Sequence, residues 1–133
     1  MTVVVDASVA VKWILPEPGS SAAAMLREQD AELSAPSLIA AEIGNAMWKA
    51  VHSGRATRSE AIEGIEAALI WFQSLIPIED LRVRALALAI ELRHPIYDCF
   101  YFALAERENA PLATADETML AVARKAKIKV RRI

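Results

Sequence analysis

The chain opens on a run of three valines that ends in an acid. The valines, residues 3–5, are β-branched and consecutive, a pattern that favours a strand covered by helices on both faces. Ligands of an open parallel sheet bind outside the carboxyl ends of its strands, so Asp6 is a candidate site residue. The same position suits a helix N-cap, in which the Asp6 carboxylate accepts a hydrogen bond from the amide of Ser8 or Val9.

Downstream of this run, short predicted strands alternate with predicted helices. Apolar periodicity, proline and glycine indicate strands at residues 2–5, 31–35, 75–78, 111–114 and 128–133. Helices are predicted at residues 7–15, 22–29, 38–53, 58–72, 81–93, 97–108 and from 116 onward. Such alternation predicts a parallel sheet with helices on both faces. We therefore expect one α/β domain over residues 1–133, a three-layer α/β/α sandwich with a central, mainly parallel sheet of four to five strands.

Serine or threonine precedes three of the predicted helices. These residues are the expected N-caps, namely Ser20 or Ser21, Ser37, and Thr57 in a capping box with Glu60. Pro77 lacks the amide that a central strand needs, so the strand around it is predicted to lie at an edge of the sheet.

Composition excludes several classes of protein. The longest apolar stretch, residues 99–105, is too short to span a bilayer, and the first six residues lack the basic start of a signal peptide. We therefore expect a soluble, cytoplasmic protein with no membrane partner. A single cysteine excludes an intramolecular disulfide, and the two histidines, His52 and His94, lack the spacing of a zinc site.

Charge is unevenly distributed along the chain. The formal net charge is -2, yet the segment from Arg124 to Arg132 carries six cations and no acid. A basic segment of this kind is typical of an edge strand that charge protects against aggregation. The alternative is a contact with nucleic acid.

Glu42 lies on the apolar stripe of the helix predicted at residues 38–53. Asn45 and Lys49 follow it at i+3 and i+7, so three polar groups share one column of that helix. An unpaired charge on a buried stripe costs on the order of several kcal/mol, so Glu42 needs a partner. Either a cation from elsewhere in the chain pairs with it, or it binds a metal ion or a substrate.

Asp98 and Asp116 begin helices, where an acid interacts favourably with the helix dipole. Asp116 also follows a predicted strand, as Asp6 does. If these acids and Glu42 converged, each pair would repel by about 4 kcal/mol at 4 Å, so the pocket would hold cations or protons. Oxygen ligands without histidine or thiolate select Mg²⁺ or Mn²⁺. A site of this type suits the hydrolysis of phosphodiester bonds.

Four segments carry a resemblance to a known family. The stretches VVVDASVAVKW, APSLIAAEIGNAMWKA, HPIYDCFYFALAE and PLATADETML resemble the signature segments of the PIN-domain ribonucleases, in particular the VapC-like toxins of type II toxin-antitoxin pairs. They occur in the order and at the intervals of that family, and together they cover nearly the whole chain.

The resemblance implies a Mg²⁺-dependent endoribonuclease, in which Mn²⁺ can substitute for Mg²⁺. It also implies an RNA substrate, an antitoxin that blocks the pocket, often with an arginine, and a homodimer. Asp6 and Asp98 would be direct metal ligands, Asp116 would bind directly or through water, and Glu42 would position water or a second ion. Matching polar positions around this acidic quartet are Ser8, Asn45 and Thr114, and nearby cations that suit RNA are Lys12, Lys49, Arg55 and Arg58.

Glu117 departs from the family pattern, since a basic or neutral residue is expected directly after Asp116. We favour a helix cap for it over a ligand of a second ion. Two other functions remain open for the chain. One is a catalytically inactive PIN-like module that binds a partner protein or nucleic acid. The other is a phosphotransferase of the haloacid dehalogenase type, which needs a second Asp where this chain has Ser8.

Overall fold

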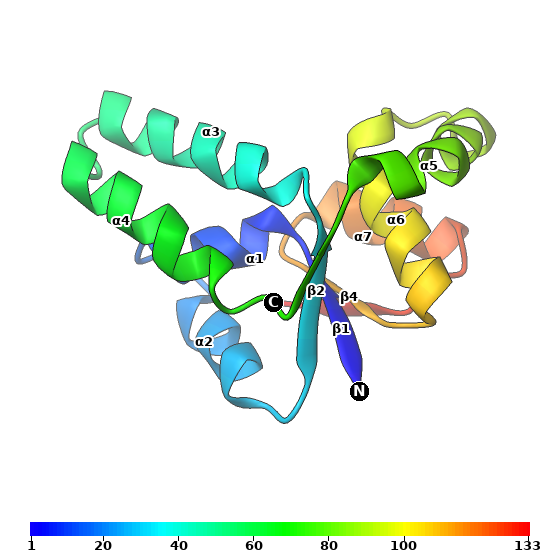
Figure 1. Cartoon of the computed structure of the whole chain (residues 1–133), viewed down its shortest axis with the longest axis horizontal. Helices are drawn as coiled ribbons and strands as arrows, with labels where there is room; N and C mark the ends of the chain where they lie inside the picture. Colours follow the sequence, from blue (N-terminus) through cyan, green and yellow to red (C-terminus); the bar gives the residue numbers. More distant parts are fainter.

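The computed structural model describes all 133 residues, and its centre is a five-stranded parallel sheet (Figure 1). The strands are β1 (Thr2–Val5), β2 (Glu32–Pro36), β3 (Ser74–Ile76), β4 (Leu112–Thr114) and β5 (Val130–Arg132). They are arranged in the order β3-β2-β1-β4-β5, so β1 is central. Its three valines are fully buried, as expected for a strand that helices cover on both faces.

Seven helices cover the sheet. They are α1 (Ala7–Val11), α2 (Ser20–Glu28), α3 (Ile39–His52), α4 (Arg58–Leu69), α5 (Ile78–Leu92), α6 (Ile96–Glu108) and α7 (Glu117–Lys125). Helices α1 to α4 lie on one side of the sheet and α5 to α7 on the other (Figure 1). The predicted three-layer α/β/α sandwich is thereby confirmed. None of these helices has the length and apolar character needed to cross a membrane.

Helix α6 is the main covering of one face of the sheet. Its residues from Cys99 to Ala105 are all buried, and the helix packs on β1, β2 and β4 and against α5. A helix buried on all sides is apolar all round, as residues 99–105 are in this chain. Cys99 is a free, buried thiol of this helix.

Two of the three predicted N-caps are wrong. Helix α2 begins after Gly19, whose φ of 89° is readily adopted only by glycine, while the Ser20 hydroxyl accepts from the Glu17 amide at 3.0 Å. The Ser37 hydroxyl accepts from the Ile78 amide at 3.2 Å, at the start of α5 rather than of α3. In both cases a partner elsewhere in the chain outcompetes the local cap. The capping box of Thr57 and Glu60 on α4 is confirmed.

The direction in which successive strands are added to the sheet reverses at β1. From β1 the chain passes to β2 and β3 on one side, and it later returns to add β4 and β5 on the other. Val5 is paired with Ala113, and the Asp6 amide donates to the Ala113 carbonyl at 3.0 Å. The carboxyl ends of β1 and β4 therefore lie side by side, and a parallel sheet binds its ligands at such a switch point.

Both edges of the sheet agree with the sequence. The strand β3 is one edge, and Pro77 directly follows it as the N-cap of α5. The basic segment forms the other edge as β5. Charged edge strands resist pairing with other chains. The position of β5 therefore agrees with the prediction that the basic segment is an edge strand.

Candidate active site

A pocket of about 450 Å³ lies at the switch point and brings all four acids together. It is lined by Asp6 after β1, Glu42 on α3, Asp98 on α6 and Asp116 before α7. Other polar or aromatic residues of its wall are Ser8, Asn45, Lys49 and Tyr97. Carboxylates from four separate segments of the chain therefore share one solvent-accessible space.

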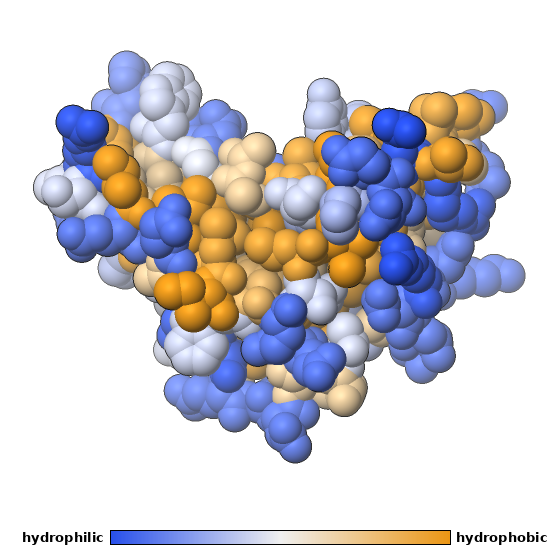
Figure 2. Space-filling model, in the orientation of Figure 1, coloured by the Kyte–Doolittle hydropathy of each residue, from blue (hydrophilic) through white to orange (hydrophobic).

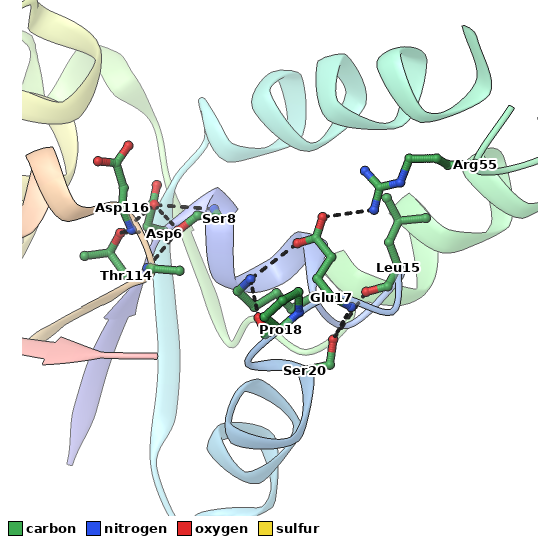
Figure 3. Close-up of polar contacts among 11 residues, drawn as sticks. Asp6, Ser8, Leu15, Glu17, Pro18, Ser20, Arg55, Thr114 and Asp116 are labelled. Atoms are coloured by element: carbon green, nitrogen blue, oxygen red, sulfur yellow. Dashed lines mark hydrogen bonds and ion pairs between the residues drawn. The ribbon is translucent and has the colours of Figure 1, made fainter. Parts of the chain in front are cut away.

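Asp6 is held through one of its two oxygens. Its Oδ2 accepts from the Ser8 hydroxyl at 2.6 Å, from the Thr114 hydroxyl at 2.8 Å and from the Ser8 amide at 3.4 Å. The amide contact is the longest of the three, so the hydroxyls fix the carboxylate more firmly than the helix cap does. Figure 3 shows the Asp6 carboxylate between Ser8 and Thr114.

The same two hydroxyls tie β4 to β1. The Thr114 hydroxyl accepts from the Asp116 amide at 3.1 Å, and the Ser8 hydroxyl accepts from the Ala115 amide at 3.0 Å. Asp116 is in turn the N-cap of α7, where its Oδ1 accepts from the Met119 amide at 3.0 Å. Hydrogen bonds thus join the segments that follow β1 and β4, and they couple the position of Asp6 to that of Asp116.

Glu42 has a neutral partner in place of a cation. The hydroxyl of Tyr101, a fully buried residue of α6, donates to Glu42 Oε1 at 2.6 Å. No lysine or arginine forms an ion pair with Glu42, so the alternative of a structural salt bridge is excluded. Burial raises the pKa of Glu42 to about 7, and the negative charges of Asp6 and Asp98 add to this effect.

Asp98 has a histidine partner that the sequence analysis did not assign to the site. The Nε2 atom of His94 lies 2.7 Å from Asp98 Oδ2. His94 precedes Asp98 by four residues, a spacing that places two side chains on the same side of a helix start. That spacing was the available signal for His94. Tyr101 follows Asp98 by three residues, so helical spacing also places Tyr101 on the same side of the helix as Asp98.

Negative charge dominates the pocket. Apart from His94 beside Asp98, no basic side chain forms an ion pair with any of the four acids. Burial raises the pKa of Asp6, and the nearby charge of Asp98 raises it further. A pocket with this charge favours protons or bound cations.

The predicted RNA-binding cations differ in their surroundings. Lys49 lines the pocket and forms no ion pair. Lys12 and Arg55 instead share Glu17, at 3.4 Å and 3.2 Å, and the Lys12 amine also donates to the Pro18 carbonyl. Figure 3 shows Arg55 and Glu17 apart from Asp6 and Asp116. Arg58 lines a separate hollow between α3 and α4.

The acids share a pattern that suits a hard cation. In each carboxylate the hydrogen bonds from the chain go to one oxygen only. The oxygens without a protein donor are Asp6 Oδ1, Glu42 Oε2, Asp98 Oδ1 and Asp116 Oδ2. No three acid, histidine or cysteine side chains are placed to hold one metal ion, so the pocket does not offer three of its carboxylates to the same ion, and a closed site of the structural zinc type is absent. Mg²⁺ binds through one or two carboxylates and retains several waters, so the set of donors fits Mg²⁺ or Mn²⁺.

Glu117 lies outside the pocket, and the predicted helix cap is wrong. Asp116, not Glu117, caps α7. The exposed Glu117 side chain forms an ion pair with Arg132 of β5. Glu117 therefore neutralises part of the positive charge of the edge strand β5.

Comparisons with known proteins agree with the fold and show the family. A family model described as the PIN domain matches residues 3–125. Ribonuclease VapC3 from Pyrobaculum aerophilum is 33% identical to this chain over 121 residues, which are 90% of this chain and 92% of that protein. The matched residues include all four acids of the pocket.

Solved structures have the same fold. PAE2754 from Pyrobaculum aerophilum matches with a TM-score of 0.67 and 27% identity, over 98% of this chain and 83% of that one. VapBC2 from Rickettsia felis, bound to a DNA fragment from its promoter, matches with a TM-score of 0.72 and 16% identity, over 100% and 99% of the two chains. VapBC-1 from nontypeable Haemophilus influenzae matches with a TM-score of 0.69 and 17% identity, over 99% and 98%. This chain therefore belongs to the PIN-domain family and is VapC-like.

Proposed function

We propose that this chain is a Mg²⁺-dependent endoribonuclease and the toxin of a toxin-antitoxin pair. The observation that carries the proposal is the single pocket in which four acids each keep one oxygen free of protein donors. The ribonuclease name of a relative that is 33% identical supports the same activity.

In this proposal Asp6 and Asp98 hold the ion directly, and Asp116 holds it directly or through water. When bound, Mg²⁺ neutralises charge on the scissile phosphate and makes a nearby water more acidic, and Mn²⁺ can replace it. Ser8 and Thr114 keep Asp6 Oδ2 occupied, so that Oδ1 is the oxygen available for the ion. Such outer hydrogen bonds orient metal ligands in many proteins.

Glu42 is suited to position a water molecule and to exchange a proton with it. Its Oε1 is occupied by the Tyr101 hydroxyl, so a proton that it takes up would reside on Oε2. Burial raises the pKa of Tyr101 well above its usual value, so the hydroxyl remains a donor. In the pocket without an ion the pKa of Glu42 is raised to about 7, and a bound Mg²⁺ would lower it and favour the ionised form, which can accept a proton from water.

The proposed substrate is RNA, approached from the side of α3. Lys49 and Asn45 follow Glu42 along this helix and line the pocket beside it. Lys49 supplies a free cation for a phosphate, and Tyr97 supplies an exposed ring on which a base can stack. Lys12 and Arg55 remain predicted contacts, although Glu17 neutralises part of their charge.

The proposed partners are an antitoxin and a second copy of the chain. Structural neighbours named VapBC support a cognate antitoxin, which would cover the acidic pocket and neutralise it with an arginine. A cytoplasmic location follows from a partner and a substrate of this kind. The proposed homodimer is supported by Val83, Leu86 and Ile90, which follow one face of α5 at i, i+3 and i+7 and are 51–81% exposed.

Substitution of single acids tests the proposal. Asp6→Asn and Asp98→Asn keep the size of the side chain and should lower cleavage of a single-stranded RNA by more than about 100-fold in Mg²⁺. EDTA should abolish cleavage by the wild type. Circular dichroism checks that both variants are folded, and Glu66→Gln on the exposed side of α4 is the charge-matched control. Wild-type cleavage by either pocket variant contradicts the proposal.

The inactive PIN-like binding module remains the second candidate, because the exposed apolar stripe on α5 would serve it equally well. The same assay separates the two functions. A module would bind RNA or a partner protein without cleaving RNA at any Mg²⁺ or Mn²⁺ concentration. A crystal soaked in Mn²⁺ provides an independent check, since anomalous density between Asp6 and Asp98 is expected only for the nuclease.

A further inference from the structure

His94 lies in the tight turn that joins α5 to α6. Arg93 ends α5 in the left-handed conformation with a φ of 52°, and Pro95 caps α6 with a φ of -54°. Proline has a fixed φ, and it disfavours the helical conformation for the residue before it. The backbone at His94 is therefore restrained on both sides, independently of the pocket.

The imidazole of His94 is also fixed by packing. Its side chain is only 15% exposed, and its ring centroid lies 6.3 Å from that of the fully buried Phe102 at an interplanar angle of 37°. A ring that is packed on one side can turn little. Nε2 is consequently aimed at Asp98 Oδ2, 2.7 Å away.

Each of the other three acids has its own donor from the chain. Ser8 and Thr114 hold Asp6, Tyr101 holds Glu42, and a backbone amide holds Asp116. His94 completes this set for Asp98. An ionised carboxylate can only accept, so Nε2 must carry the hydrogen in this contact. With Oδ2 engaged in this way, Oδ1 is the oxygen that remains for a ligand in the pocket.

We infer that His94 is a positioning residue, which fixes the Asp98 carboxylate so that its Oδ1 is presented to the pocket. The inference rests on the proposed function, because the ligand that Oδ1 meets there is the divalent ion. A purely structural role is the competing explanation, in which the ring only packs between the start of α6 and Phe102.

Two substitutions separate the hydrogen bond from the packing. His94→Phe keeps a ring against Phe102 and removes the donor, whereas His94→Gln keeps a donor amide and removes the ring. For a positioning residue, His94→Phe retains the melting temperature but weakens Mn²⁺ binding, measured by calorimetry, by about 10- to 100-fold. RNA cleavage falls with it, and His94→Gln restores most of both. The inference is overturned if His94→Gln binds Mn²⁺ more weakly than His94→Phe, or if His94→Phe binds Mn²⁺ as tightly as the wild type.

His52→Ala is the matched control. His52 is the other histidine of the chain; it is exposed on α3, stacks on Trp48 and does not line the acidic pocket. Its replacement should leave Mn²⁺ affinity and cleavage unchanged. An equal loss of Mn²⁺ affinity in His52→Ala and His94→Phe would overturn the assignment to His94.

Failure of the proposed function is distinguishable from failure of this inference. A wild-type chain that neither binds Mn²⁺ nor cleaves RNA contradicts the nuclease. The ¹⁵N spectrum of the metal-free chain then still tests the hydrogen bond. A protonated Nε2 of His94 that shifts on Asp98→Asn supports it, and an unprotonated Nε2 overturns it.

Discussion

Burial of Glu42 makes the stability of the fold depend on pH. Its pKa is raised from 4.5 to about 7, so the folded chain binds this proton more tightly than the unfolded chain. The stabilisation is complete below pH 4.5 and is lost as the pH rises through 7. In EDTA, we expect the free energy of unfolding to fall over this range, and Glu42→Gln to remove part of the fall. Urea denaturation at pH 5 and pH 8 measures the effect.

The pKa of Asp6 shifts in the same direction, so the comparison with Glu42→Gln is what isolates Glu42. Glu66→Gln is the control, because this exposed acid of α4 lies away from the pocket. If Glu42→Gln lost as much stability as the wild type between pH 5 and pH 8, the desolvation of Glu42 would be refuted as a cause.

Removal of the Tyr101 hydroxyl tests the hydrogen bond to Glu42. Tyr101→Phe should lower the free energy of unfolding by about 1 to 2 kcal/mol at pH 8, where Glu42 is ionised and the bond is charge-assisted. The pKa of Glu42 should rise further, because this bond lowers it. Denaturation measures the first effect, and a carboxyl ¹³C titration measures the second. Tyr97→Phe should change stability by less than about 0.5 kcal/mol, since Tyr97 is exposed.

Individual site residues were only partly predictable from the sequence. Asp6 was expected either to cap a helix or to belong to a site, and the structure gives it both positions, with the hydroxyls as its stronger partners. The predicted helices at residues 81–93 and 97–108 place His94 between two helices and Tyr101 within the second, and the structure agrees. Their hydrogen bonds to Glu42 and Asp98 depend on how α6 is placed against α3 and on the turn before it. Periodicity contains no information on such contacts.

At the scale of elements, apolar periodicity predicted every strand and helix to within a few residues. The errors lie at the ends. The helix expected at residues 7–15 closes at Val11, and Ser37 contacts the start of α5. Hydroxyl groups bind whichever amide is nearest in the folded chain, so a cap can be predicted only where the local partner has no competitor. Thr57 with Glu60 is such a case, since both residues are exposed.

Two glycines inside helices give opposite predictions for the packing of these elements. A Cβ at Gly64 of α4 would overlap Ile14 Cγ2, which follows α1 and is stiff because isoleucine is β-branched. Gly64→Ala should therefore lower the free energy of unfolding by about 1 to 3 kcal/mol. At Gly44 of α3 the nearest atom is Ile65 Cδ1 at 3.7 Å, an ordinary contact. Gly44→Ala should raise the free energy by up to about 1 kcal/mol, and denaturant unfolding of both variants checks the pair.

At the scale of the whole molecule, the order of the strands decides where the acids meet. The alternation of elements predicts a parallel sheet, but it does not determine that β4 is added beside β1 on the side opposite β2. That order places the loops after β1 and β4 together, and α6 crosses behind them with Asp98 in its first turn. The spacing of these segments along the sequence does not predict this strand order or the meeting of the four acids. The resemblance to a family supplied it instead.

The surface of the molecule leads to the last prediction, which concerns its association. Figure 2 shows apolar atoms at the corner formed by α5, where Val83, Leu86 and Ile90 are exposed. Most soluble homo-oligomers are twofold dimers, in which one patch meets its own copy. We expect light scattering to give twice the chain mass of 14.5 kDa, and Ile90→Glu to give the single mass, because a charge would be buried without a partner.

Ile70→Glu is the control for this experiment. Ile70 is 80% exposed at the end of α4, away from the stripe on α5, so the dimer should persist when it carries a charge. Circular dichroism should show both variants folded like the wild type, since each side chain is exposed in the single chain. A wild-type chain that remains at 14.5 kDa at high concentration, or an Ile90→Glu chain that stays dimeric, would exclude α5 as the interface. Because the acidic pocket lies wholly within one chain, the Ile90→Glu monomer should still bind Mn²⁺, which separates assembly from the chemistry of the site.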